Sequence, residues 1–317
     1  MADLSVTLCG VGLPTPFVLA SGILGTEAEL MARVARAGAG AITAKSCGPQ
    51  PRAGHPNPTV LAWQHGLINA VGLANPGVEA EIEELAKTRA YLRPMGVALI
   101  ASVFAGTVEG FARVAARVID AQPDLVEINI SCPNVHDDLG TPFAADATSA
   151  VKVTAAVKEA VADRAPVLVK LSPNVANIAA IAQRVEAAGA DGITAINTLP
   201  GMIIDIHAQQ PILANRTGGM SGPAIRPLAV RCVYEIYRAV SIPIVGTGGV
   251  SSGRDAIEMI MAGASAVGVG SAVYHDGPEA FDRLCDEIEA LLAELECESV
   301  AELRGVAHRD LGGRSMV

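Results

Sequence analysis

The chain has 317 residues, half of them hydrophobic and 18% charged, so it is long enough for one large barrel or two modest domains around a substantial core. Its formal net charge of −10 and pI near 5.1 argue against a DNA or tRNA partner, because a phosphate backbone normally binds a basic face. No apolar run reaches the length of a membrane span, and Met1–Leu4 lacks the pattern of a signal peptide, so we expect a cytoplasmic location.

Short apolar runs alternate with amphipathic stretches along the whole chain, which is typical of repeated βα units. The predicted strands are Phe17–Ala20, Ala41–Ala44, Val97–Val103, Leu125–Ile130, Val167–Leu171, Gly192–Ile196, Ile244–Gly246 and Ala266–Val269. The predicted helices lie near residues 27–38, 78–91, 107–121, 146–163, 176–188, 224–240, 253–262 and 278–295. Eight such units predict an α/β fold, a TIM (β/α)8 barrel, with residues 1–317 as a single domain. A doubly wound open sheet is the rival, but no Gly-x-Gly-x-x-Gly turn follows the first strand.

Long segments follow three of the predicted strands. Residues 46–77 follow the second strand, residues 133–143 follow the fourth, and residues 198–223 follow the sixth. Loops of this length in a compact domain more often form lids or binding loops than filler. We therefore expect them to contribute to a site, and residues 133–143 to close over a substrate.

Every predicted strand has a polar or glycine cluster at or just after its carboxyl end. In strand order the clusters are Ser21-Gly22, Lys45-Ser46, Ser102, Asn129 with Cys132, Lys170 with Ser172, Asn197-Thr198, Gly248-Gly249 and Gly270-Ser271. A helix cap or a turn explains any one of them, but eight at the same end of a barrel indicate a site. The last two clusters let backbone N–H groups approach an anion and predict a phosphate site, with ligand-free glycine turns as the alternative.

The segment Asn129-Ile-Ser-Cys-Pro-Asn134 places a thiol and two carboxamides where the fourth strand ends, because Pro133 cannot continue the strand. A thiol can act as a base, and carboxamides can bind the edge of a planar ring. Taken alone, Cys132 is more typical of a small buried hydrophobe. Lys45 and Lys170 follow apolar strand residues and are expected to point into the barrel mouth, toward an anion or a reduced flavin, unless they extend to water.

Metal binding by this chain is not expected. The six cysteines are scattered and form no Cys-x-x-Cys pair, and the six histidines show no metal-ligand spacing.

Five motifs together resemble those of the dihydroorotate dehydrogenase family, in family order, over about residues 16–271. They are Asn129–Asn134, Asn69-Ala-Val-Gly-Leu-Ala-Asn-Pro-Gly77, Lys170-Leu-Ser-Pro-Asn-Val175, Asn197-Thr198 and Thr217-Gly-Gly-Met-Ser-Gly-Pro-Ala-Ile225. The resemblance implies the soluble class 1, because Cys132 stands where the membrane-bound class has serine. The motifs that begin at Lys170 and Thr217 resemble the NAD-linked type 1B catalytic subunit. That type implies FMN on this chain, FAD and a [2Fe–2S] cluster on a separate electron-transfer subunit, and a homodimer at the core of a heterotetramer.

The resemblance also implies roles for individual residues. Cys132 would be the general base that removes a proton from C5 of dihydroorotate while a hydride leaves C6 for N5 of FMN. The substrate-binding residues would be Lys45, Asn69, Ala70, Val71, Gly72, Leu73, Asn129, Asn134, Asn197 and Thr198. The FMN-binding residues would be Ser21, Lys45, Ser46, Ser102, Asn129, Lys170, Ile196, Gly222, Gly248, Gly249, Gly270 and Ser271. Ser102 departs from the asparagine common in the family and has a shorter reach.

Four alternative functions stay open at this point. The fumarate-linked class 1A enzyme differs in the motifs of the fifth and seventh strands. The flavin domain of dihydropyrimidine dehydrogenase is usually accompanied by ferredoxin-like cysteine clusters, which this sequence lacks. The tRNA dihydrouridine synthases are disfavoured by the acidic charge. A non-enzymatic barrel is disfavoured because Cys132, Lys45 and Lys170 are all present.

Overall fold

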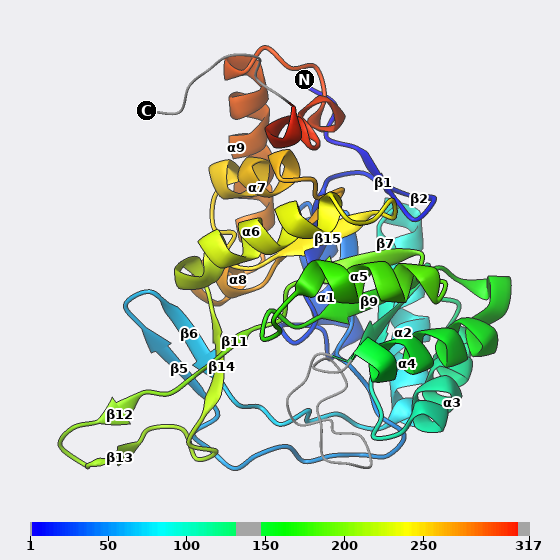
Figure 1. Cartoon of the computed structure of the whole chain (residues 1–317), viewed down its shortest axis with the longest axis vertical. Coiled ribbons are helices and arrows are strands. Elements are labelled where there is room, and N and C mark those ends of the chain that lie inside the picture. The colour runs from blue at the N-terminus through cyan, green and yellow to red at the C-terminus, as the bar shows by residue number, and fades with distance from the viewer. Residues whose placement is uncertain (1, 131–146, 310–317) are drawn as a thin grey trace.

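The computed structural model of the chain describes residues 2–130 and 147–309, and a closed barrel of eight parallel strands forms its centre (Figure 1). Around the barrel the strands are β3 (Phe17–Leu19), β4 (Ala41–Thr43), β7 (Ala98–Val103), β8 (Leu125–Asn129), β9 (Val167–Leu171), β10 (Gly192–Ala195), β15 (Ile244–Thr247) and β16 (Ala266–Val269). Every residue of β7, β8 and β9 is buried, as expected for parallel strands covered on both faces. The predicted TIM barrel is confirmed.

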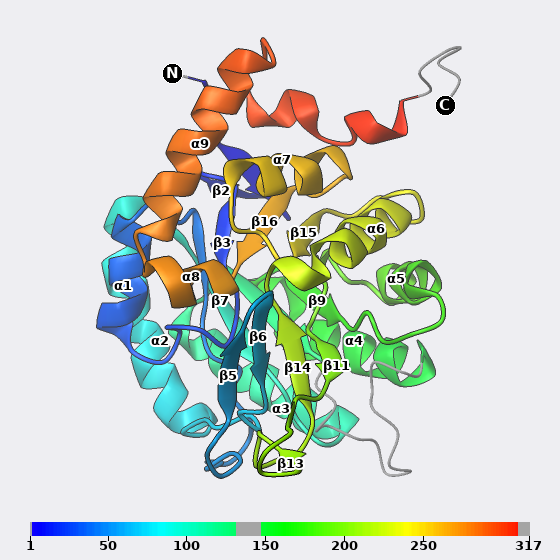
Figure 2. The same cartoon turned by 90° about the vertical axis from the view of Figure 1, so that its left-hand side faces the viewer.

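Helices surround the barrel, and the predicted ones form within a few residues of their expected positions (Figure 2). They are α1 (Ala28–Arg36), α2 (Val78–Leu92), α3 (Val108–Val118), α4 (Ala147–Val161), α5 (Ile178–Ala187), α6 (Arg226–Tyr237), α7 (Gly253–Met261), α8 (Ser271–Asp276) and α9 (Ala280–Glu294). Short 3-10 turns lie at Arg93–Met95, Ile119–Ala121, Ala162–Arg164, Pro223–Ile225, Val300–Leu303 and Val306–His308. The short helix α8 was not predicted. Within the described residues, no helix is long and apolar enough to cross a membrane.

A hairpin that the sequence did not predict closes the amino end of the barrel. Its strands are β1 (Val6–Leu8) and β2 (Val11–Leu13), paired antiparallel. Leu8 and Leu13 are buried in one cluster with inward-facing residues of the barrel strands, among them Leu125. The barrel interior is therefore apolar at the amino ends of the strands, and the polar groups inside the barrel lie toward the carboxyl ends.

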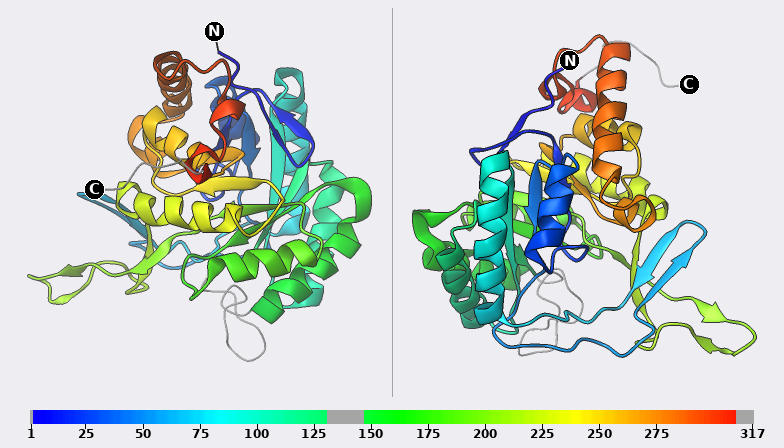
Figure 3. Two further views of the ribbon diagram at one scale, coloured as in Figure 1. Left: turned by 45° about the horizontal axis from the view of Figure 1, so that its top comes forward. Right: turned by 180° about the vertical axis from the view of Figure 1, so that it is seen from behind.

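Two of the long segments fold together at that opposite end. Residues 46–77 contain β5 (Val60–Trp63) and β6 (Gly66–Asn69), and residues 198–223 contain β11 (Leu199–Gly201), β12 (Ile204–Asp205), β13 (Gln210–Pro211) and β14 (Gly218–Ser221). Strands β11, β14, β6 and β5 form an antiparallel sheet, with β12 and β13 as a separate hairpin. Figure 2 shows β5, β6, β14 and β11 side by side, and Figure 3 shows them projecting from the end of the barrel opposite the β1–β2 hairpin.

Glycines allow β14 to approach its neighbours this closely. A Cβ on Gly219 would lie 2.0 Å from Thr198 Oγ1, and a Cβ on Gly218 would lie 2.6 Å from the carbonyl oxygen of Asn69. The register pairs Gly219 with Asn69, which brings residues from the two segments to one place above the barrel.

Candidate functional site

A pocket lies at the carboxyl ends of the barrel strands, below the antiparallel sheet. Its lining residues come from several strand ends and from the segment that follows β6: Ser21, Gly22, Lys45, Ser46, Asn69, Ala70, Val71, Gly72, Leu73, Asn129, Lys170, Asn197 and Thr198. All but Gly22 are among the residues with a predicted binding role, and Gly22 belongs to a predicted strand-end cluster. Their binding roles stay predictions, but the structure does bring them together.

Ser46 forms the centre of a hydrogen-bond network in the pocket floor. Its Oγ lies 3.2 Å from Ser21 Oγ and 2.8 Å from Ser102 Oγ, and it accepts a hydrogen bond from Asn129 Nδ2 at 3.0 Å. Ser102 is only 1% exposed and lies beneath Ser46 instead of lining the pocket. Its hydroxyl already has protein partners, and its predicted contact with a flavin stays a prediction.

Glu127 is a member of this network that sequence reasoning missed. Its carboxylate is 2% exposed, accepts from Ser102 Oγ at 3.4 Å through Oε1, and accepts from Thr194 Oγ1 at 2.8 Å through Oε2. The apolar run around this position predicts only a strand. The available signal was its spacing: Glu127 precedes Asn129 by two residues, so both side chains point to the same face of β8.

Lys170 is a buried ammonium at the base of the same pocket. Its side chain is 6% exposed, and the register places it beside Asn129 on β8 and Thr194 on β10. It also lines a small cavity inside the barrel, together with Glu127 and Thr247, whose Oγ1 is buried without a hydrogen-bond partner among the described residues. No ion pair joins Lys170 to a described carboxylate, so a polar or anionic ligand would compensate the loss of water around it.

Lys45 has a buried carboxyl group near it, from the first turns of α2. Glu81 is 2% exposed, and its Oε1 has no hydrogen-bond partner within the described part of the chain. Burial raises the pKa of Glu81 to about 7, while the charge of Lys45 lowers it and that of Glu84 raises it. Burial also raises the pKa of the Cys47 thiol well above its ordinary value, which keeps this thiol protonated and unreactive.

The remaining predicted flavin-binding residues of the described chain form a second group: Ile196, Gly222, Gly248, Gly249, Gly270 and Ser271. Gly249 has φ +78°, and a Cβ there would lie 2.7 Å from the carbonyl oxygen of Gly222 and 2.9 Å from the backbone nitrogen of Arg226. A Cβ on Gly222 would lie 3.6 Å from Ser271 Oγ. The backbones at Gly249 and Gly222 therefore approach each other as closely as only glycine allows, next to Ser271, which suits a phosphate cradle.

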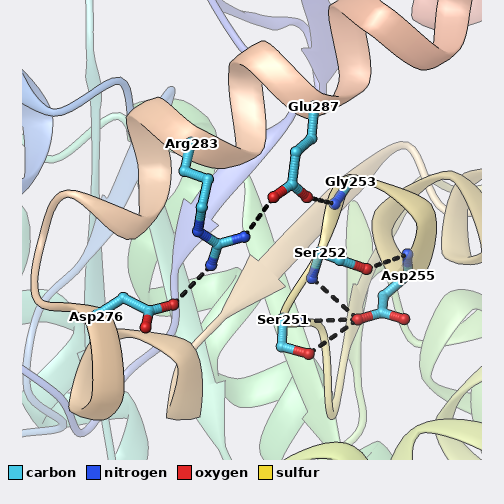
Figure 4. Close-up of polar contacts among 7 residues, drawn as sticks. All are labelled: Ser251, Ser252, Gly253, Asp255, Asp276, Arg283 and Glu287. Atoms are coloured by element: carbon cyan, nitrogen blue, oxygen red, sulfur yellow. Dashed lines mark hydrogen bonds and ion pairs between the residues drawn. The ribbon is translucent and has the colours of Figure 1, made fainter.

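The loop after β15 is held in place by Asp255, which sequence reasoning also missed. Its Oδ2 accepts from the backbone nitrogens of Ser251 and Ser252 and from Ser251 Oγ, each at 3.0 Å (Figure 4). Ser252 Oγ accepts in return from the Asp255 backbone nitrogen, which completes a capping box at the start of α7. Asp255 also forms an ion pair with Arg226. The glycine cradle therefore has a rigid support.

Helix α9 extends this support, as Figure 4 also shows. Glu287 accepts from the backbone nitrogen of Gly253 and from Arg283, and Arg283 donates to Asp276 at the end of α8. The helices that follow β15 and β16 are thus joined by polar contacts next to the predicted cradle.

Cys132 and Asn134 lie outside the described residues, as does the predicted lid at 133–143. Their predicted roles are not tested by this structure.

A (β/α)8 barrel that gathers two lysines and three carboxamide side chains at the carboxyl ends of its strands has the arrangement of barrel enzymes. The family model described as Dihydroorotate dehydrogenase matches residues 3–292, and the chain belongs to this family.

Three similar proteins each carry the name "Dihydroorotate dehydrogenase B (NAD(+)), catalytic subunit". The protein from Methanothermobacter thermautotrophicus is 46% identical over 306 residues, which cover 96% of this chain and 98% of that protein. The protein from Pyrococcus abyssi is 41% identical over 96% of this chain and 99% of its own length. The protein from a Geobacillus species is 44% identical over 96% of both chains.

Proposed function

We propose that this chain is the catalytic subunit of an NAD-linked dihydroorotate dehydrogenase, which oxidises (S)-dihydroorotate to orotate with FMN in de novo pyrimidine (UMP) biosynthesis. The observation that carries the proposal is the single pocket that contains Lys45, Lys170 and the carboxamides of three asparagines. The near full-length similarity to relatives with that name supports the same reaction.

The pocket residues suit a flat ring that carries a carboxylate and an imide. Lys45 supplies a positive charge, and carboxamides can donate to a ring carbonyl and accept from a ring N–H. All three carboxamides are held by the protein. Asn69 Nδ2 donates to the carbonyl oxygen of Gly219 at 3.3 Å, Asn129 Nδ2 donates to Ser46 Oγ at 3.0 Å, and Asn197 Oδ1 accepts from the Thr198 backbone nitrogen at 2.8 Å. Fixed amides of this kind orient a ligand without reorganisation when it binds.

The residues present also fit FMN. Lys170 would hold the polar ring of the flavin, and the cradle of Gly222, Gly248, Gly249 and Ser271 would hold its phosphate. When bound, the flavin supplies the two-electron acceptor that the protein side chains lack. The buried positions of Lys170 and Asn129 exclude water from that side of the pocket.

Cys132 is proposed as the base that takes the proton from C5 of the substrate, a role carried over from the family. Cys47 does not compete for this role, because it is fully buried and burial holds its thiol protonated. A base role requires a thiolate, whereas an ordinary cysteine thiol is mostly protonated at neutral pH.

Electron transfer to NAD⁺ requires a second subunit in this proposal. Within the described residues no group of three or more His, Cys, Asp or Glu side chains could hold a metal ion. Following the family resemblance, we assign FAD and the [2Fe–2S] cluster to an electron-transfer partner, bound to a homodimer of this chain in the cytoplasm. The words "NAD(+)" and "catalytic subunit" in the names of the relatives favour this arrangement over the fumarate-linked class and the dihydropyrimidine dehydrogenase-like alternative.

The test is an anaerobic half-reaction. Dihydroorotate added to the purified, flavin-loaded chain should bleach the flavin absorbance, and dihydrouracil should not. The Cys132→Ala variant should lose this reduction, whereas Cys47→Ala should keep it. Addition of NAD⁺ to the reduced chain alone should leave the flavin reduced. A loaded flavin that stays oxidised with dihydroorotate would overturn the proposed substrate.

A further inference from the structure

A continuous row of hydrogen bonds connects the buried carboxylate of Glu127 to the pocket. It runs from Glu127 to Ser102 at 3.4 Å, from Ser102 to Ser46 at 2.8 Å, and from Ser46 to Asn129 at 3.0 Å. Glu127, Ser102, Ser46 and Asn129 are all buried, so water does not replace these bonds. We call this row the Glu127 relay.

The chemistry of the groups fixes the direction of the relay. A carboxylate only accepts hydrogen bonds, so the single hydroxyl proton of Ser102 is committed to Glu127. In its contact with Ser46, Ser102 can then only accept a hydrogen bond. The single hydroxyl proton of Ser46 is therefore used in the bond to Ser102. Ser46 must therefore accept from residue 129. The geometry agrees with this deduction, because Nδ2 of Asn129, the donor end of its amide, faces Ser46 Oγ.

The second carboxylate oxygen of Glu127 also accepts a hydrogen bond, which holds the side chain in one orientation. Oε2 accepts from Thr194 Oγ1 at 2.8 Å, so both oxygens of the buried charge have donors. Two hydrogen bonds to a charged acceptor hold it in one orientation. The start of the relay is therefore fixed by the core of the barrel and not by the ligand.

We propose that Glu127 is a positioning residue that acts through Ser102 and Ser46 and makes Asn129 present its carbonyl oxygen, a hydrogen-bond acceptor, to the pocket. The ligand group that this orientation selects is an N–H donor, such as that of a pyrimidine imide or a flavin ring. The identity of that ligand rests on the proposed function, whereas the direction of the relay does not.

A double-mutant cycle tests the direction. Asn129→Asp replaces the amide donor by a carboxylate, which can only accept. With Glu127 unchanged, this carboxylate faces a lone pair of Ser46 Oγ, and the hydrogen bond between residues 46 and 129 is lost. Glu127→Gln lets residue 127 donate to Ser102, so the relay can reverse and Ser46 can donate to the carboxylate introduced at position 129. The thermal midpoint of the double variant, measured with excess FMN and no substrate, should lie roughly 2 °C or more above the sum of the single effects.

A second cycle excludes simple repulsion between carboxylates at positions 127 and 129. Ser102→Ala changes no charge but frees the Ser46 hydroxyl to donate to the carboxylate introduced at position 129. Asn129→Asp should therefore cost less in the Ser102→Ala background than in the wild type. If the changes in thermal midpoint simply add in this second cycle, the proposal is overturned, even if the first cycle shows coupling. If Glu127→Gln does not fold, the second cycle alone decides.

Titration with orotate separates the proposed function from the proposed direction of the Glu127 relay. Glu127→Gln should weaken orotate binding about tenfold, the usual effect of one well-placed hydrogen bond, with the second cycle still non-additive. If the flavin-loaded wild type binds no orotate, the proposed function fails, and the thermal cycles still decide whether the relay has a fixed direction.

Discussion

The buried carboxyl group of Glu81 allows a quantitative test of the electrostatics next to Lys45. The side chain is 2% exposed and one of its oxygens has no hydrogen-bond partner among the described residues. Burial raises its pKa from 4.5 to about 7, against the lowering effect of Lys45. Replacement by glutamine keeps the shape and removes the titration.

The sign of the effect follows from proton binding. Between pH 4.5 and 7 the folded chain retains a proton on Glu81 that the unfolded chain has released, so the free energy of unfolding decreases as the pH rises. The difference between the two pKa values corresponds to about 3 kcal/mol, which is lost in full above pH 7. Glu81→Gln should thus exceed the stability of the wild type by less than about 1 kcal/mol near pH 5 and by about 1 to 3 kcal/mol at pH 8. The lower end of this range applies if the glutamine no longer offsets the charge of Lys45.

Urea unfolding of both proteins at pH 5, 6, 7 and 8, without substrate, measures this difference. Glu84→Gln is the matched control, because Glu84 lies on the same helix and bonds to Lys87 and to the backbone nitrogen of Ala28. Those contacts lower the pKa of Glu84, so its removal should not stabilise the chain at pH 8. A Glu81→Gln effect of equal size at pH 5 and pH 8 would refute the assignment of a raised pKa to burial.

Two further predictions concern the cradle and its support, and a third concerns an ion pair elsewhere in the barrel. Gly249→Ala, whose Cβ would lie 2.7 Å from a backbone oxygen, should raise the FMN dissociation constant at least tenfold in a fluorescence titration; Gly12→Ala, where a Cβ meets nothing within 4 Å, should not. Asp255→Ala should lower the free energy of unfolding by about 2 kcal/mol, because three donors lose their buried acceptor; an unchanged urea midpoint would contradict this. Asp124→Asn weakens a half-buried ion pair and a bond to the Leu99 backbone nitrogen and should lower the thermal midpoint, whereas Glu79→Gln, at an exposed pair, should leave it unchanged.

Local patterns were sufficient to predict the barrel, because each strand is a short apolar run and the helices between them are amphipathic, some with a capping residue such as Thr107, Asn177 or Ser252. The antiparallel sheet above the barrel was not predicted. Asn69 and Gly219 pair although they lie 150 positions apart in the chain, and neither β6 nor β14 is a continuous apolar run. Their pairing depends on the barrel, which brings the ends of the second and sixth βα units to one rim.

The rule that barrel sites lie at strand ends predicted the pocket lining well, since it uses only the position of each polar residue after an apolar run. The rule does not predict how far each of those residues lies below the surface of the pocket. Ser102 lies near the end of one predicted strand and Ser46 just after another, yet the structure places Ser102 beneath Ser46, out of the pocket. The stagger between neighbouring barrel strands determines this depth, and a linear sequence does not report it.

The position of Glu127 argues for a role in the site over a role in stability. Lys170 on β9 also has an inward-facing residue two positions before it, but that residue is Leu168, which belongs to the apolar cluster of the barrel interior. The register places Leu168 directly beside Glu127, so an apolar side chain would have suitable neighbours at 127. Replacing a buried ionic group and its polar partners together with apolar side chains is often neutral or stabilising, so folding alone does not require a polar network at Glu127, Ser102 and Thr194. An apolar residue at position 127 could not accept a hydrogen bond from Ser102, and it would leave the direction of the Ser46–Ser102 bond open. In the proposed relay, the fixed direction of these bonds is what orients the Asn129 amide.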